Sequence, residues 1–227
     1  MDRDNELVHT IETALRENLK HQIIDLNVHS TDGTVYLTGF VDCLDDKIQA
    51  QKVVQNYVPH IRLENNLTIA MNGNISDKEL KEQTEDNLRH CEFSDRLKNV
   101  NVKVEGGSAT LIGSVNTLAD EIKALEVARQ TIGLKDVVSN LTIETAEEIY
   151  DDALLKSMVQ QALNDSDLDR HSIIPSVKNG VVTLEGLVDH RYEVEMAGEL
   201  IANVEGVIKI RNQLRNRQDD GEDPYVY

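Results

Sequence analysis

The sequence predicts an α+β fold of three tandem small sandwiches, each with a three-stranded mixed sheet packed against two helices. The first observation is a phrase that occurs three times, as VYLTGFVD, ATLIGSVN and VTLEGLVD, with its central glycine at Gly39, Gly113 and Gly186. These glycines are 74 and 73 residues apart, a period that indicates repetition of a whole domain. The second observation is that apolar spacing changes from helical to alternating within every copy.

Each copy opens with apolar residues spaced for one face of a helix. These residues are Leu7, Ile11, Leu15 and Leu19 in the first copy, Leu80, Thr84 and Leu88 in the second, and Ile149, Leu154, Leu155, Met158, Val159 and Ala162 in the third. SDKE from Ser76 and TAEE from Thr145 have the side chains of a capping box and therefore predict helix starts.

Two short strands joined by a glycine turn follow each leading helix. Val100, Val102 and Val104 alternate with polar residues before the turn sequence EGG, and STDGTVYL and VKNGVVTL repeat this pattern in the other copies. Asp-Gly and Asn-Gly tolerate the positive φ that a tight hairpin requires. We therefore expect three β-hairpins.

A second helix is expected over 42–57, 116–131 and 189–204. Small residues in register, Ala50, Ala124 and Ala197, would let this helix lie close to a sheet, with Val54, Ala128 and Ile201 four residues later on the same face. The helix would end at Pro59, Gly133 and Gly206 because proline cannot continue a helix and glycine caps one. A right-handed crossover to the last strand would make the second and third strands parallel.

This pattern divides the chain into domains at residues 1–72, 73–145 and 146–218, followed by an acidic and disordered tail at 219–227. The formal charge of −18 is spread evenly, since the three repeats carry −5, −4 and −5 and the tail carries −4. Because such a field repels phosphate backbones, nucleic acid is not an expected partner.

Cysteine content and the first residues bear on the cellular compartment. The two cysteines, Cys43 and Cys91, lie in different repeats, so free thiols are expected. No basic segment followed by an apolar core begins the chain, and no apolar run approaches the length of a transmembrane helix. The chain as written is therefore expected to be cytoplasmic, with a periplasmic or envelope location as the alternative if an export signal has been removed.

The spacing VxLxGxV, helix, GVxxVxNxL resembles that of the BON domain family, which is named for bacterial osmotically induced and nodulation proteins. The third copy fits best, with VTLEGLVD, VEGVIKIRNQL and Asn212 in the expected place. The second copy has Ser139 at the asparagine position, and the first keeps Asn65 but replaces the glycine by Pro59. The resemblance covers residues 1–217.

The resemblance implies a non-enzymatic module of bacterial envelope or osmotic-stress proteins that binds phospholipid or protein partners at membranes. The acidic charge weighs against direct contact with anionic head groups. Two main functions stay open: a binding or scaffolding protein that associates with phospholipid membranes, and a soluble protein–protein interaction or self-assembly module without lipid binding. A third class, a small-ligand or cation-responsive stress protein, is suggested only by the acidity. The oligomeric state is not predicted.

No set of residues predicts catalysis, a cofactor or a metal site. Gly39, Gly113, Gly186, Gly133 and Gly206 are interpreted as structural, since none belongs to a phosphate-binding motif. DSDLDRH from Asp165 begins like a calcium loop but has Arg170 at the glycine position and lacks the closing glutamate. Asp45 and Asp46 are interpreted as solvated acids at a helix start. The apolar helix stripes are interpreted as domain cores rather than membrane-binding faces.

Overall fold

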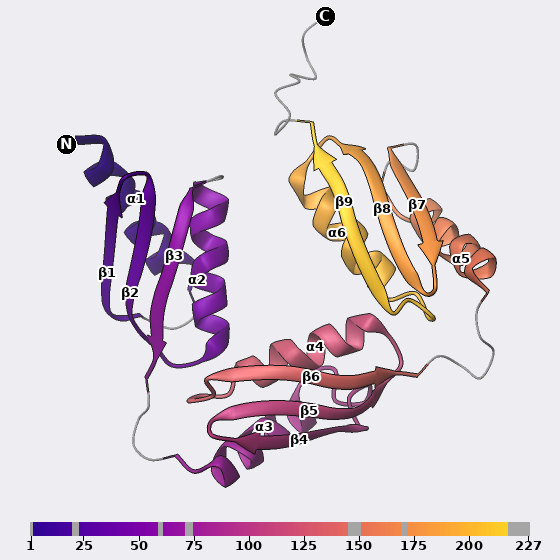
Figure 1. Cartoon of the computed structure of the whole chain (residues 1–227), viewed down its shortest axis with the longest axis horizontal. Coiled ribbons are helices and arrows are strands. Elements are labelled where there is room, and N and C mark those ends of the chain that lie inside the picture. The colour runs from indigo at the N-terminus through magenta and orange to yellow at the C-terminus, as the bar shows by residue number, and fades with distance from the viewer. Residues whose placement is uncertain are drawn as a thin grey trace, which may run out of the picture. The chain divides into compact units, whose positions relative to one another are not determined.

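The computed structural model describes residues 2–19, 23–58, 61–70, 75–144, 151–168 and 172–217, without the side chains of residues 2–4. Figure 1 shows three separate three-stranded sheets, each accompanied by helices of its own repeat. The strand orders are β1-β2-β3, β4-β5-β6 and β7-β8-β9. Each repeat runs helix, strand, strand, helix, strand, as the sequence predicts.

The first repeat consists of α1 (Asp2–Asn18), β1 (Ile24–Thr31), β2 (Thr34–Val41), α2 (Leu44–Tyr57) and β3 (Arg62–Ile69). β1 pairs antiparallel with β2, and β2 pairs parallel with β3, so the predicted parallel crossover is confirmed. The predicted helix end at Pro59 lies outside the described residues. The core of this repeat contains residues from both helices and all three strands: Ile11, Leu15, Val28, Val35, Leu37, Val41, Ala50, Val54 and Leu67.

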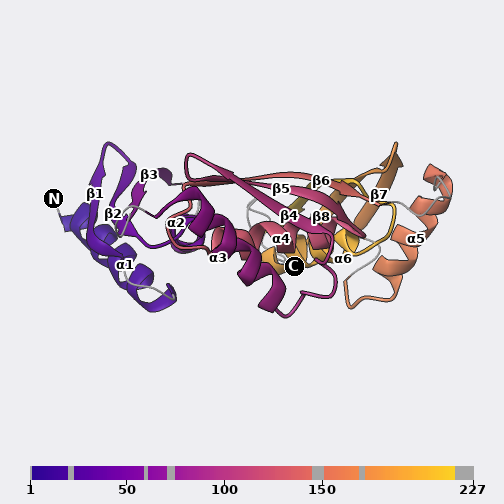
Figure 2. The same ribbon diagram turned by 90° about the horizontal axis from the view of Figure 1, so that it is seen from below.

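The second repeat consists of α3 (Asp77–His90), β4 (Val100–Glu105), β5 (Ser108–Val115), α4 (Leu118–Arg129) and β6 (Asp136–Ile143). The predicted capping box at the start of α3 is present, because the Ser76 hydroxyl accepts from Glu79 N–H and the Glu79 carboxylate accepts from Ser76 N–H. In the turned view of Figure 2, β5 and β6 lie on one side and α3 and α4 on the other.

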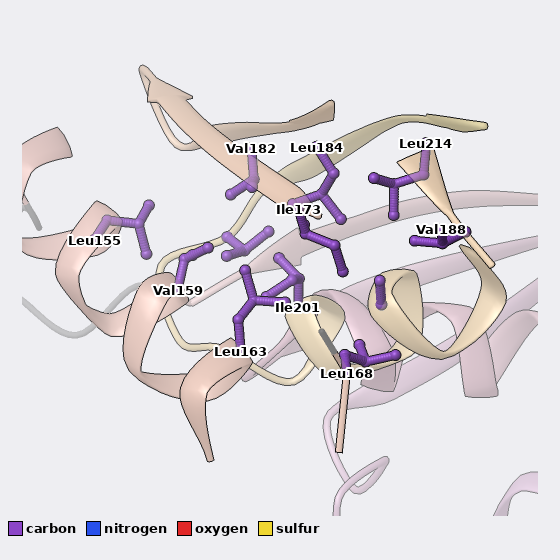
Figure 3. Close-up of a cluster of buried hydrophobic side chains, with 12 residues drawn as sticks. Leu155, Val159, Leu163, Leu168, Ile173, Val182, Leu184, Val188, Ile201 and Leu214 are labelled. Atoms are coloured by element: carbon purple, nitrogen blue, oxygen red, sulfur yellow. The ribbon is translucent and has the colours of Figure 1, made fainter. Parts of the chain in front are cut away.

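The third repeat consists of α5 (Asp152–Asn164), β7 (Ile173–Lys178), β8 (Val181–Val188), α6 (Arg191–Ala202) and β9 (Lys209–Asn216). β7 pairs antiparallel with β8, and β8 pairs parallel with β9. Figure 3 shows its core, in which α5 and α6 direct apolar side chains toward those of the strands.

The start of the third leading helix differs from the prediction. α5 begins at Asp152, and the Asp151 carboxylate accepts from Ala153 N–H as its N-cap. The predicted cap at Thr145 and the predicted apolar residue Ile149 lie outside the described residues, as does the predicted tail at 219–227. Leu154 is 51% exposed, so its assignment to the buried face is wrong. Leu155 and Val159, which are also predicted for this face, are buried and form it together with Leu163, at the spacing of one helix side.

The three hairpin turns have the predicted conformation. Both central residues have positive φ in each turn: Asp32 and Gly33, Gly106 and Gly107, and Asn179 and Gly180. Two successive positive φ values give the turn the twist of the flanking strands. The hairpins therefore fix which residues of each strand face the helices.

Candidate binding face of the third sheet

The repeat glycines lie at places where the backbone has a positive φ. Gly39, Gly113 and Gly186 lie in the second strand of their hairpins with φ of 141°, 123° and 140°, and Gly133 and Gly206 follow the second helices with φ of 87° and 86°. A side chain at Gly186 would collide with the neighbouring strand, since an added Cβ would lie 1.9 Å from the Ser172 carbonyl oxygen.

An asparagine in the last strand joins that strand to the second helix. Asn212 Nδ2 donates to the Val194 carbonyl oxygen of α6 at 2.7 Å, and its Oδ1 accepts from Leu214 N–H at 3.2 Å. Asn65 makes the same pair of hydrogen bonds in the first repeat, to Lys47 and Leu67. This asparagine therefore has a structural role in both repeats.

Asn212→Ala is expected to lower the free energy of unfolding of the third repeat by about 1–2 kcal/mol, since it removes two hydrogen bonds of ordinary strength. Urea unfolding followed by circular dichroism measures this difference. Gln213→Ala is the matched control because Gln213 is the exposed neighbour in the same strand, and its effect should stay within about 0.5 kcal/mol. Equal effects of the two substitutions would show that the Asn212 contacts contribute nothing.

An aspartate at the start of a leading helix binds the hairpin turn of its own repeat. The Asp77 carboxylate accepts from Gly106 N–H at 2.8 Å and from Gly107 N–H at 2.9 Å. The Asp152 carboxylate accepts in the same way from Asn179 N–H and Gly180 N–H. These carboxylates satisfy turn amides that no strand partner reaches, so they too are structural.

The interpretation of Asp46 as a solvated acid is wrong. Asp46 is only 5% exposed, and the Cys43 thiol donates to its Oδ2 at 3.1 Å. Burial raises the pKa of the Cys43 thiol to about 12, so this cysteine stays protonated at neutral pH. Both cysteines are free thiols, as predicted, and Cys43 is not an activated nucleophile.

The described residues contain no group of three His, Cys, Asp or Glu side chains that could hold a metal ion. Asp165 and Asp167 of the incomplete calcium motif are described, whereas Asp169, Arg170 and His171 are not.

Basic side chains gather on one face of the third sheet. Val182, Leu184 and Val188 of β8 lie in the core, so the alternate residues point to the opposite face, which neither α5 nor α6 covers. Figure 1 shows α6 behind β9, with this face toward the viewer. We call it the open face, and its residues are Ile174, Ser176 and Lys178 of β7, Val181, Thr183, Glu185 and Leu187 of β8, and Lys209, Arg211, Gln213 and Arg215 of β9.

The open face therefore carries four basic side chains and one acidic side chain. Lys209 lies opposite Val181, Arg211 opposite Thr183 and Arg215 opposite Leu187. Three cations therefore share this face of β9, with Gln213 between Arg211 and Arg215. Among the described residues, Lys178, Lys209 and Arg211 take part in no ion pair. Within the described part of the third repeat, these three positive charges are therefore not neutralised by direct pairing.

The matching faces of the other sheets are not basic. The positions of Lys209 and Arg211 correspond to Arg62 and Glu64 in the first repeat. In the second repeat they correspond to Asp136 and Val138. At these positions an excess of basic side chains is therefore found on the third sheet alone among the three.

This face was not predicted from the sequence, because the charge summed over the third repeat is −5 and the sum hides how the charge is distributed. The signal was present in the last strand, KIRNQLRN, where Lys209, Arg211 and Arg215 are separated by even numbers of residues. Side chains at even spacing in a strand share a face. Charge counted by strand face would have predicted the site.

Comparison with protein families finds the BON domain in residues 3–71, 73–145 and 151–218. Among curated proteins, osmotically-inducible protein Y of Escherichia coli (strain K12) is 26% identical over 124 residues. That match covers 52% of this chain and 62% of the relative, so the chain spans less than two thirds of the relative's length.

Two solved structures also align with most of the chain. The C-terminal domain of CdsD, a structural protein of the type III secretion system of Chlamydia trachomatis, is 15% identical, with 92% of this chain and 96% of that chain covered and a TM-score of 0.25. The periplasmic domain of the inner membrane protein PrgH from S. typhimurium is 13% identical, with 84% and 98% covered and a TM-score of 0.24. TM-scores this low support no inference about this chain.

Proposed function

This chain belongs to the BON domain family through all three of its repeats, and from that premise we propose that it is a non-enzymatic binding or scaffolding protein of the bacterial envelope or osmotic-stress type that associates with phospholipid membranes. The proposal is carried by the open face of the third sheet. The helices of the third repeat leave this face uncovered, and its charged side chains are mainly basic. A sheet face without helices over it suits contact with an extended surface better than enclosure of a small substrate.

Flotation with liposomes of several lipid compositions tests the membrane part of this proposal. The protein is expected to migrate with vesicles, and migration with none of the compositions would remove lipid binding and leave protein partners. Thermal unfolding of the same preparation serves as the control for folded protein.

The second candidate function is a soluble protein–protein interaction or self-assembly module. Tyr192 and Met196, one helical turn apart on α6, are 61% and 40% exposed and offer an apolar patch to a protein partner. Sedimentation across a concentration series and pull-down with purified protein as bait distinguish this function from membrane association.

We place the working location of the protein in the bacterial envelope, in keeping with the family to which it belongs, and take residues 1–72, 73–145 and 146–218 as its domains. None of the helices in the described part of the chain combines the length and the hydropathy needed to span a bilayer. Cell fractionation of the native gene product tests the location.

A further inference from the structure

The charges of the third repeat are separated between its two sides. The open face carries four basic residues and one acidic residue, whereas residues 146–218 as a whole contain 8 basic and 13 acidic residues. Among the acids outside the open face are Glu193, Glu195 and Glu199 of α6, which covers the opposite side of the sheet. The third repeat is therefore a dipole with a positive sheet side.

Salt screening makes this separation effective. At physiological ionic strength, interactions between exposed charges decay over about 8 Å. A helix layer is about 10 Å thick. An anionic surface that approaches the open face is therefore attracted by the near cations and is largely screened from the helix-side acids, despite the net charge of the repeat.

Aliphatic side chains accompany the cations on this face. Ile174 is 64% exposed, and Leu187 lies partly exposed opposite Arg215. The face carries no aromatic ring, although ring stacking is the usual device for holding unpaired bases. Cations together with aliphatic side chains match the boundary between phosphate head groups and acyl chains.

From these observations we infer that the open face of the third sheet is the membrane-docking surface of this protein and that its occupant is an anionic phospholipid bilayer. This inference rests on the proposed function. It adds which surface binds the membrane, which repeat carries that surface and what charge the lipid has. Lys178, Lys209, Arg211 and Arg215 contact the head-group phosphates, and Ile174 reaches the acyl boundary. The helix side, with its acids, points away from the bilayer.

The test compares binding of the full chain to phosphatidylcholine vesicles with binding to phosphatidylcholine vesicles that contain phosphatidylglycerol. The Lys209→Gln/Arg211→Gln variant removes two cations from the open face and is expected to weaken binding to the anionic vesicles about 25-fold, at about fivefold for each cation. The Arg62→Gln/Lys103→Gln variant is the matched control, because it removes two cations from the other sheets and should bind like the wild type.

Each outcome has a distinct meaning. Preference for anionic vesicles that is lost in Lys209→Gln/Arg211→Gln and weakened by added salt supports the inference. Vesicle binding that both double variants retain overturns the inference and leaves the proposed function standing. Binding to no vesicle removes the inference and the lipid-binding part of the proposed function, and leaves protein partners. Salt-sensitive binding of RNA or polyglutamate without vesicle binding would assign the face to another polyanion. Circular dichroism of each variant checks that it is folded.

Discussion

Gly186→Ala is expected to unfold the third repeat, or nearly so, while the first two repeats stay folded. Gly186 has φ of 140°, a conformation that L residues rarely adopt, and an added Cβ would lie 1.9 Å from the Ser172 carbonyl oxygen. That oxygen belongs to backbone next to the paired strand β7, so it cannot move away as a side-chain end could. Backbone strain and overpacking together predict a cost of about 3–5 kcal/mol.

Hydrogen exchange measured on peptides by mass spectrometry resolves this effect by repeat. Loss of amide protection is expected over residues 172–217, with protection unchanged over 23–58. Gly33→Ala is the matched control: Gly33 also has positive φ, at 73°, but an added Cβ there meets no atom within 4 Å. It should cost its repeat only about 1–2 kcal/mol. If Gly186→Ala were no more damaging than Gly33→Ala, the repeat glycine would not be needed for packing.

The order of elements in each repeat was predictable because it depends on local rules. Apolar period, capping boxes and Asn-Gly or Asp-Gly turns act over a few residues, and each was found where the sequence placed it within the described residues. Leu154 marks the limit of this reasoning. Two adjacent leucines cannot both face the same side of a helix, and the choice of Leu155 depends on where β7 and β8 lie.

Contacts between distant elements were not predictable from a single sequence. The hydrogen bonds of Asp152 to the turn at Asn179 and of Asn212 to α6 join residues that only the tertiary structure brings together. Asp46 was misread for the same reason, since a carboxylate at a helix start is solvated unless the fold buries it. In the folded chain the buried Asp46 carboxylate accepts from the thiol of Cys43, the N-cap residue of α2.

The basic face required knowledge of which strand side the helices cover. Alternation alone assigns Lys209, Arg211 and Arg215 to one side of their strand, but the same pattern would fit a sheet covered on that side. Burial of Leu214 and Val182 decides that the cations are on the uncovered side. The negative net charge of the chain weighs against anionic partners. The distribution of charge over the third repeat nevertheless favours an anionic partner at this face.

Leu184→Ala is expected to lower the stability of the third repeat by about 2–5 kcal/mol, because Leu184 is fully buried in the core of that repeat and its loss leaves a cavity. For a domain of this size the midpoint of thermal unfolding should fall by on the order of 10 °C or more. Leu37 and Leu111 hold the equivalent positions and are also fully buried, so their alanine variants are matched tests of the first and second repeats.

The number of calorimetric transitions in these variants tests whether the repeats are domains. The first and third repeats have separate apolar cores, which contain residues from all the strands of their own sheet. If each core sustains its own domain, Leu184→Ala should move one transition to lower temperature and leave the transition of the first repeat in place. A single transition that shifts as a whole would show instead that the three sandwiches unfold as one cooperative unit. The open face of the third sheet would then depend for its stability on repeats that carry no such charge.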